Sequence, residues 1–306
     1  MLRTAAILLL TAASAAAQSR GRTAVPDAVR DRLASFEDVT YARYGDRTLQ
    51  LDLYRPAGDA KLPAVVCLHG GGWWRGERQS MTNLAMALAD RGYVTATITY
   101  RLSGEAPFPA AVHDGKAAVR FLRANADQYG IDPNRIGVTG LSAGGHLAAL
   151  LATSGGVAKL EGDGGHAGFS SAVQAAVPMG AQSNFRRHHA NVQKSDPDPP
   201  GEKPNLWVQF LGGKPGERPE AWRLASPITH LAAGDPPTRF LSGDKDSPTT
   251  HAEEFRAKAA EAGVVSDYRP IPNAPHSFLG GQRAFNIAVD HTADWFDRHL
   301  KGQTAD

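Results

Sequence analysis

The sequence GLSAG at residues 140–144 constrains the fold more than any other stretch, because it lies between a strand-like segment and an apolar, helix-like one. Residues 135–139 are typical of a short strand, and residues 145–151 of a buried helix. The glycines permit a sharp turn that lifts the Ser142 hydroxyl clear of a sheet, with the helix N-terminus facing it. The pattern predicts a strand–turn–helix with Ser142 as nucleophile; the alternative is a glycine turn with an incidental serine.

A glycine run upstream supplies a second element of the same chemistry. HGGGWW at residues 69–74 follows the continuous apolar run 64–68, which is typical of a buried parallel strand. Consecutive glycines let backbone N–H groups turn toward a substrate, and an attacking serine needs such donors where negative charge develops on the carbonyl. We expect Gly71, Gly72 and Ala143 to supply an oxyanion hole, against the alternative of a flexible loop, and His69 to brace that loop.

An acid and a base that could activate this serine follow it in the sequence. Residues 238–243 are strand-like and end at Asp244 and Asp246, and His276 lies in a Pro-flanked loop before the last predicted helix. The hypothesis is that Ser142 attacks a carbonyl carbon, His276 takes its proton, and Asp246 holds the imidazole tautomer. Asp244 remains the alternative acid.

These motifs together resemble the α/β-hydrolases of the feruloyl-esterase-like group, neighbours of the hormone-sensitive-lipase-like esterases. The resemblance implies a mostly parallel central sheet with helices on both faces and an irregular lid-like insertion. Two loops depart from the usual pattern: MGAQSN at 179–184, where a Gly-Pro-Thr-Asp-like turn is common, and SPTT at 247–250, where Val-Pro is common. The matching stretches are HGGGW at 69–73, YRL at 100–102, DPNRIGVTGLSAGGHLAAL at 132–150, SPI at 226–228, GDKDSP at 243–248 and PHSF at 275–278.

Alternating strand-like and helix-like segments independently predict an α/β fold, with a ligand site beyond the carboxyl ends of the strands. Residues 18–36 are expected to be an N-terminal leader with a helix at 26–35, and residues 37–302 to be one catalytic domain. Residues 47–54 alternate in polarity and are expected to form an antiparallel edge strand. The Gly-rich and Pro-rich stretches within 155–221 are expected to contain the lid and pocket insertions.

Residues 1–17 have the pattern of a bacterial-type secretory signal peptide, with a positive start, an apolar stretch and small residues before the cleavage site. This predicts a secreted or periplasmic protein without stable membrane insertion after cleavage; an uncleaved anchor is the alternative.

The single cysteine, Cys67, lies within a strand-like apolar run and is expected to be buried. Lys and Arg total 33 against 31 Asp and Glu and no basic stripe is present in the sequence, so nucleic-acid binding has little support. No metal or cofactor motif is present in the sequence, and none is expected.

The substrate is less constrained than the chemistry. Trp73 and Trp74 could stack on an acyl or sugar ring, or could be packing residues. The aromatic and histidine side chains His188, His189, Trp207 and Phe210 are candidates for the pocket wall, with ordinary packing as the alternative, and His146 is expected to be structural. The favoured function is a secreted serine carboxylesterase acting on short-chain or aromatic esters, with acetyl or feruloyl groups on plant polysaccharide as the setting. The alternatives are an aryl formamidase, a serine peptidase and a non-catalytic binding module on a hydrolase scaffold.

Overall fold

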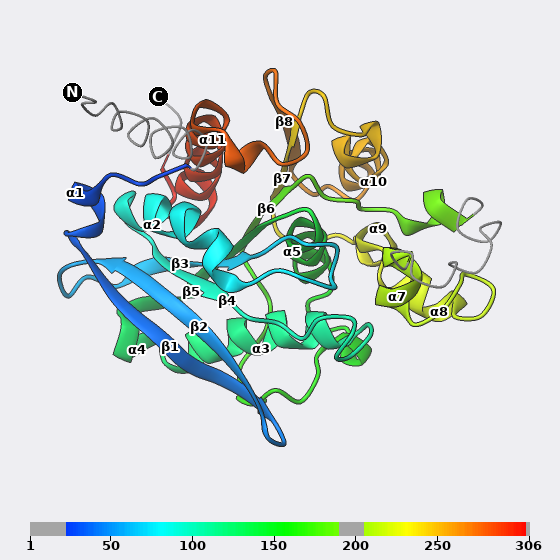
Figure 1. The fold of residues 1–306 in the computed structure, drawn as a ribbon, viewed down its shortest axis with the longest axis horizontal. Coiled ribbons are helices and arrows are strands. Elements are labelled where there is room, and N and C mark those ends of the chain that lie inside the picture. The colour runs from blue at the N-terminus through cyan, green and yellow to red at the C-terminus, as the bar shows by residue number, and fades with distance from the viewer. Residues whose placement is uncertain (1–22, 190–204, 304–306) are drawn as a thin grey trace, which may run out of the picture.

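A single eight-stranded sheet forms the centre of the molecule (Figure 1). The computed structural model describes residues 23–189 and 205–303. The strands lie in the order β1-β2-β4-β3-β5-β6-β7-β8. Their bounds are β1 Leu33–Tyr44, β2 Arg47–Pro56, β3 Leu62–Leu68, β4 Val94–Ile98, β5 Ile131–Leu141, β6 Ala175–Met179, β7 Thr238–Gly243 and β8 Ser266–Ile271.

The sheet is parallel from β4 across to β8, while β2 pairs antiparallel with both β1 and β4. The central strand β3 shows why both of its faces must be covered: Val66 and Leu68 enter one apolar cluster, and Val65 and Cys67 enter another on the opposite side. The α/β fold class expected from the sequence is therefore confirmed, and the carboxyl ends of the parallel strands share one edge.

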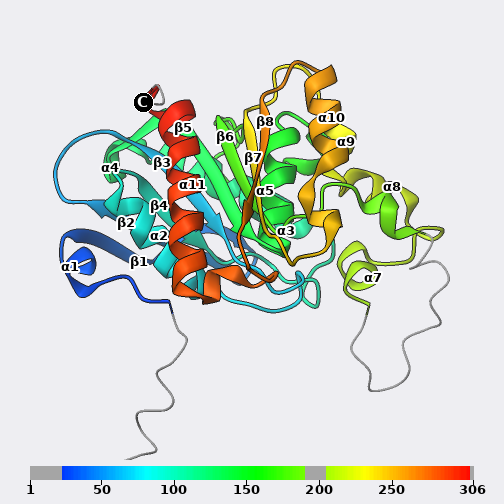
Figure 2. The same cartoon turned by 90° about the horizontal axis from the view of Figure 1, so that it is seen from above.

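Helices cover both faces of this sheet (Figure 2). Helices α2 and α11 pack on one face with the cluster that contains Val65, and α3 and α5 pack on the other with the cluster that contains Val66. The α-helices are α1 Asp27–Arg30, α2 Thr82–Asp90, α3 Ala110–Ala124, α4 Ala126–Tyr129, α5 Ala143–Thr153, α7 Leu206–Leu211, α8 Pro219–Leu224, α9 Pro227–His230, α10 Glu253–Glu261 and α11 Gln282–Leu300. The short 3₁₀ turns are η1 Arg78–Met81, η2 Ala158–Leu160, η3 Phe185–His188, η4 Pro248–His251 and η5 Phe278–Gly280.

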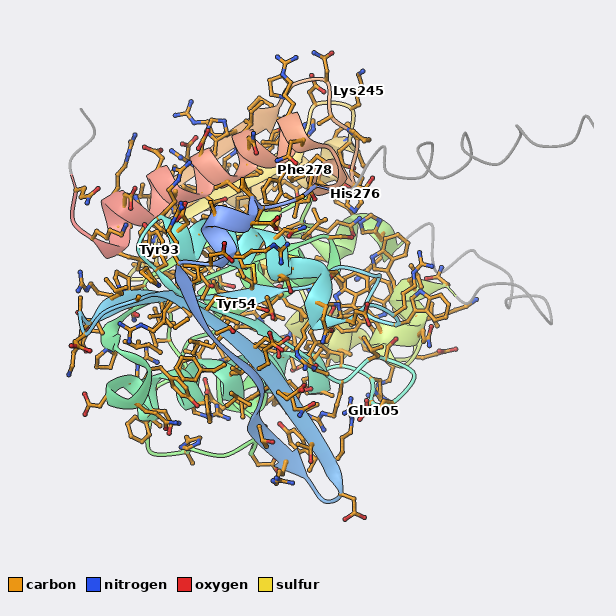
Figure 3. All side chains as sticks on the ribbon, turned by 60° about the vertical axis from the view of Figure 1, so that its left-hand side comes forward. Tyr54, Tyr93, Glu105, Lys245, His276 and Phe278 are labelled. Atoms are coloured by element: carbon orange, nitrogen blue, oxygen red, sulfur yellow. The ribbon has the colours of Figure 1, made fainter. Side chains whose placement is uncertain are left out.

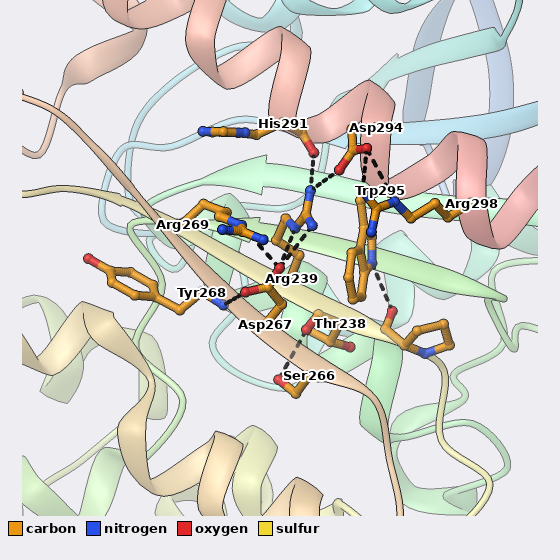
Figure 4. A network of polar contacts seen from close by, with 11 residues as sticks. Thr238, Arg239, Ser266, Asp267, Tyr268, Arg269, His291, Asp294, Trp295 and Arg298 are labelled. Carbon is orange, nitrogen blue, oxygen red and sulfur yellow. Dashed lines mark hydrogen bonds and ion pairs between the residues drawn. The ribbon is translucent and has the colours of Figure 1, made fainter. Parts of the chain in front are cut away.

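A buried arginine joins the end of the sheet to α11 (Figure 4). The Arg239 guanidinium, on β7, pairs with Asp267 on β8 at 2.8 Å and with Asp294 on α11 at 2.6 Å. The same group lies 4.5 Å from the centre of the Trp295 ring. A buried cation needs such partners, and these hold the strands on one side of the site against the helix that follows His276.

The N-terminal expectations need correction. The strand β1 begins at Leu33, inside the predicted leader 18–36, and the helix there covers only Asp27–Arg30 rather than 26–35. Because β1 lies outside β2, the predicted strand at 47–54 is present but is not the edge strand. The expected signal peptide, residues 1–17, lies outside the described residues. Within residues 23–189 and 205–303, no helix is both long and apolar enough to cross a membrane.

Candidate active site

Ser142 lies in the sharp turn between β5 and α5, as its sequence context predicts. Its backbone has φ 58° and ψ −115°, a conformation that is strained for a residue with a side chain. The Ser142 N–H donates to the Met179 carbonyl at 2.8 Å, which fastens the turn to the end of β6. The hydroxyl is therefore held at the carboxyl edge of the sheet, beside the first turn of α5.

The glycines after Ser142 are required by close backbone packing. A Cβ on Gly144 would lie 2.1 Å from the Leu68 carbonyl oxygen, and one on Gly145 would lie 2.2 Å from the Met179 carbonyl oxygen. Both distances are far below van der Waals contact, so neither position accepts a side chain unless the backbone moves. Helix α5 is thus packed directly on the ends of β3 and β6.

His276 and Asp246 complete a hydrogen-bonded row with Ser142. The Ser142 hydroxyl donates to His276 Nε2 at 2.8 Å, and His276 Nδ1–H donates to Asp246 Oδ2 at 2.7 Å. The His276 side chain is 46% exposed, whereas that of Asp246 is 7% exposed. His276 lies just before α11, at the end of the molecule that also carries Lys245 (Figure 3). The histidine is therefore open to a substrate, while its acid partner is withdrawn from solvent.

The structure separates the two acids that the sequence left open. The Asp244 carboxylate accepts hydrogen bonds from the backbone N–H groups of Asn273 at 2.9 Å and Ala274 at 3.1 Å. These donors, that of Asn273 first, hold the pKa of Asp244 below its usual value. Asp246 instead faces His276, so Asp244 fastens the loop that carries the histidine and does not contact the imidazole.

The glycine loop lies against the Ser142 turn, as expected. A Cβ on Gly70 would lie 3.0 Å from the Leu141 carbonyl oxygen and 3.4 Å from Ser142 Cβ. Gly71 and Gly72 have φ values of 120° and 61°, which favour glycine. The N–H groups of Gly71, Gly72 and Ala143 donate to no described residue. Three backbone donors that have no acceptor in the described part of the chain are thus available for an incoming oxygen.

His69 braces this loop rather than facing Ser142. Its ring stacks on Tyr100 at 4.1 Å between centroids, and its Nδ1 lies 2.8 Å from the Gly70 carbonyl oxygen. The Tyr100 hydroxyl donates to the His69 carbonyl at 2.8 Å. Desolvation lowers the pKa of His69, so the ring is neutral at pH 7 and serves as a rigid support.

Trp73 is a packing residue, so the expectation that it could stack on a substrate is wrong. It is 6% exposed, its ring stacks on Phe210 at 4.6 Å, and its Nε1–H donates to His146 Nδ1 at 3.2 Å. Phe210 is also buried and belongs to the core rather than to the pocket wall. Trp74 is half-buried, with the Arg75 guanidinium 5.7 Å from its ring centre, and it remains a candidate substrate contact.

The described residues offer little for a metal or a second nucleophile. Among them, no group of three or more His, Cys, Asp or Glu side chains is arranged to hold a metal ion. Cys67 is fully buried in β3, and desolvation raises the pKa of its thiol to about 12, so it is a thiol at neutral pH. In the part of the chain that the structure describes, the serine, the imidazole and the backbone donors are the groups placed to react.

A family model, BD-FAE, matches residues 51–258, a range that includes the glycine loop, Ser142 and Asp246. The chain belongs to the BD-FAE family. This confirms the resemblance to feruloyl-esterase-like α/β-hydrolases. Among curated relatives, esterase LipQ of Mycobacterium tuberculosis is 31% identical over 83% of this chain. That alignment spans 60% of LipQ, so the chain matches only part of this relative's length.

Solved structures of esterases share the fold. A truncated carbohydrate esterase from gut microbiota superposes with a TM-score of 0.75, at 28% identity, over 88% of this chain and 96% of its own. Esterase 2 of Thermogutta terrifontis, solved with propionate bound, superposes with a TM-score of 0.68, at 27% identity, over 86% and 92%. Both superpositions extend over most of the sheet and its covering helices.

The segment around α7 forms a wall beside the site of this BD-FAE protein. The Leu206 Cδ1 atom lies 2.6 Å from where a Cβ on Gly72 would be, so it covers the glycine loop. Trp207 stacks on His188 at 4.8 Å and donates its Nε1–H to Gln182 Oε1 at 3.1 Å. His189 packs edge-on against Trp222, a contact that favours the packing alternative.

Two residues of this wall were not predicted from the sequence. Gln182 follows β6 closely, and a Cβ on the intervening Gly180 would lie 3.0 Å from His276 Cε1. Its position after a parallel strand is the signal that could have identified it, because such loops line the carboxyl edge of the sheet. Leu206 carries no comparable signal. The remainder of the expected insertion, residues 190–204, lies outside the described residues.

Proposed function

We propose that the protein is a serine carboxylesterase that forms an acyl-enzyme at Ser142. The observation that carries this proposal is the row from Ser142 Oγ through the His276 ring to Asp246, with contacts of 2.8 and 2.7 Å. A serine hydroxyl is a weak nucleophile by itself, and a base oriented by an acid activates it. The carboxylic ester hydrolases among its relatives support an ester as the substrate.

The geometry supports one sequence of proton transfers. Ser142 Oγ attacks the carbonyl carbon while its proton moves to His276 Nε2, and Asp246 stabilises the resulting imidazolium. The N–H groups of Gly71, Gly72 and Ala143 receive the developing oxyanion. The tetrahedral intermediate collapses as the alkoxy leaving group takes the proton from His276, which releases the alcohol and leaves the acyl group on Ser142.

Deacylation repeats this sequence with water. His276 Nε2 takes a proton from a water molecule that attacks the acyl carbon, and a second tetrahedral intermediate forms against the same backbone donors. Its collapse breaks the bond to Ser142 Oγ, which recovers its proton from His276. The carboxylic acid leaves and the starting state is restored.

We propose small or aromatic acyl groups as substrates, with acetyl or feruloyl esters of plant polysaccharide as the setting. The carbohydrate esterase and the propionate-bound esterase among the solved relatives support this choice. Leu206 covers the glycine loop, which leaves less room for a long acyl chain beside Gly72. The signal-peptide pattern of residues 1–17 supports secretion or export to the periplasm, where such esters are met.

The test is hydrolysis of p-nitrophenyl esters from acetate to decanoate by the wild-type protein and by Ser142→Ala. Activity that is highest from acetate to butyrate and lost in the variant is expected. An aryl formamide and acetylated and feruloylated xylan, assayed in parallel, separate the possible substrates. If no ester is hydrolysed while the formamide is, the carboxylesterase assignment fails; turnover unchanged in Ser142→Ala excludes the serine mechanism.

A further inference from the structure

The Asp246 carboxylate is held by more than His276. Its Oδ1 accepts the backbone N–H of Ser247 at 2.7 Å. Its Oδ2, the oxygen that faces His276, also lies 3.2 Å from the Thr250 hydroxyl. Because the carboxylate is 7% exposed, protein donors must replace most of its water, and the Thr250 hydroxyl is one of few at hand.

The Thr250 hydroxyl has two acceptors for its single hydrogen. It lies 2.8 Å from the Ser247 carbonyl oxygen as well as 3.2 Å from Asp246 Oδ2. The Ser247 carbonyl already accepts the backbone N–H of Thr250 at 2.9 Å, so it does not depend on the hydroxyl. A hydroxyl rotates freely to suit its surroundings, and an ionised acceptor attracts its hydrogen more strongly than a neutral one.

Thr250 is well placed to hold this geometry. It lies in η4, the turn that follows Asp246, and it is 2% exposed, so its side chain has little freedom to move away. Among the described residues, it contributes the one side-chain hydroxyl bonded to Asp246. Asp244, which lies on the same turn, is engaged by the amides of Asn273 and Ala274 instead.

We propose that Thr250 is a positioning residue for the row of Ser142, His276 and Asp246: its hydroxyl orients the Asp246 carboxylate so that Oδ2 faces His276 Nδ1. This inference rests on the proposed function, since it assumes that His276 activates Ser142. Without the hydroxyl, the donors that the described residues offer to this carboxylate are His276 and the backbone N–H of Ser247. The fraction of molecules with an aligned imidazole then falls, and turnover falls with it.

Thr250→Val tests this inference, because valine keeps the branched shape and removes the hydroxyl. Thr250→Ser restores the hydroxyl without the methyl group. Thr249→Val is the matched control: it removes the neighbouring hydroxyl, which bonds Ser247 Oγ at 2.8 Å and has no contact with Asp246. Each variant is compared with the wild-type protein for kcat, KM and Tm.

Two readouts separate this inference from the proposed function. The first is kcat and KM on p-nitrophenyl acetate. The second is the rate at which diethyl p-nitrophenyl phosphate modifies Ser142: the Ser142 Oγ–P bond forms, the P–O bond to the aryl group breaks, p-nitrophenolate leaves, and the serine proton passes through His276 to solvent. This reaction reports serine activation even if the protein hydrolyses no ester, so it tests the role of Thr250 even in the case where the proposed function fails.

Loss of the acid in triads of this kind costs about 10⁴-fold in turnover, so loosening it by one hydrogen bond should cost about tenfold. We expect Thr250→Val to lower kcat and the phosphorylation rate about tenfold, with KM within twofold and Tm within about 4 °C of the wild-type values. Thr250→Ser should recover most of both rates, and Thr249→Val should retain them. Wild-type rates in Thr250→Val overturn the inference, as does a loss that Thr250→Ser does not restore or that Thr249→Val matches.

Discussion

Acidification should destabilise the fold through His146, which is buried in the first turn of α5. Its Nε2–H donates to the Ala225 carbonyl at 2.7 Å, and its Nδ1 accepts the Trp73 indole N–H at 3.2 Å. The bond from Trp73 requires the neutral ring, because a protonated Nδ1 would face the Trp73 donor, whereas Nε2–H donates to Ala225 in either protonation state. Desolvation by burial lowers the pKa of His146 from 6.5 to about 4.

The sign and size of the effect follow from this shift. Because the pKa is lower in the folded than in the unfolded protein, the unfolded state binds the proton first as the pH falls, and stability is lost from about pH 6.5 down to about pH 4. Between pH 7 and pH 4.5 the expected loss in the free energy of unfolding from this one residue is about 2 kcal/mol.

A variant isolates this contribution from that of the other histidines. His146→Gln supplies a donor for Ala225 and an acceptor for Trp73 but does not titrate, so it should lower stability at pH 7 while reducing the loss between pH 7 and pH 4.5 by about 2 kcal/mol. The remaining loss belongs to residues common to both proteins. Burial also lowers the pKa of seven further histidines among the described residues: His69, His113, His188, His189, His230, His291 and His299.

Urea denaturation followed by tryptophan fluorescence, at pH 7 and pH 4.5, measures the free energy of unfolding of the wild-type protein and of His146→Gln at each pH. The comparison concerns the difference between two pH values within each protein, so the packing cost of the substitution cancels. An equal loss in wild-type and His146→Gln protein would falsify the assignment of a neutral, buried His146. A larger loss in the variant would also refute it.

Two substitutions probe the site itself. Asp246→Asn should lower kcat on p-nitrophenyl acetate about 10³- to 10⁴-fold, because the amide cannot hold the His276 tautomer. Asp244→Asn alters only the support of the histidine loop, so the decrease in its kcat should be smaller by a factor of at least about 100. Equal decreases in the two variants would contradict the assignment of the acid. Gly71→Ala should lower kcat by at least 10²-fold, because its Cβ would lie 2.0 Å from the Arg75 carbonyl oxygen and displace the donor loop. Circular dichroism checks that each variant folds, and a fully active Gly71→Ala protein would rule out the predicted backbone shift.

Short-range sequence patterns predicted the parts of the site that short-range structure builds. The turn at Ser142 and the glycine loop each lie directly after a buried strand, so a few neighbouring residues determine their backbone. Asp244 and Asp246 lie on one turn, so the sequence favoured Asp246 but left Asp244 as the alternative. The choice depends on the loop that carries His276, which β7 and β8 bring alongside through their pairing.

Other features depend on contacts that no local pattern reveals. Two irregularities of register, between Phe36 and Val39 and between Thr40 and Ala42, interrupt the alternation of β1, so the strand was missed and the edge was assigned to β2. Trp73 is buried by Phe210, which lies far along the chain. The residue type alone suits a core and a binding surface equally well, so only the tertiary structure separates them.

The glycines at the nucleophile turn have a consequence for how this protein can change. A Cβ on Gly144 would meet the carbonyl oxygens of both Leu68 and His69, so one substitution there displaces the serine and the donor loop together. The serine turn and the donor loop are therefore constrained together, and a side chain at Gly144 would disturb both at once. New acyl or alcohol preferences have to arise from side chains that border this turn and loop, such as Leu206, Gln182 and Trp74. A variant library for altered selectivity would be best confined to those positions.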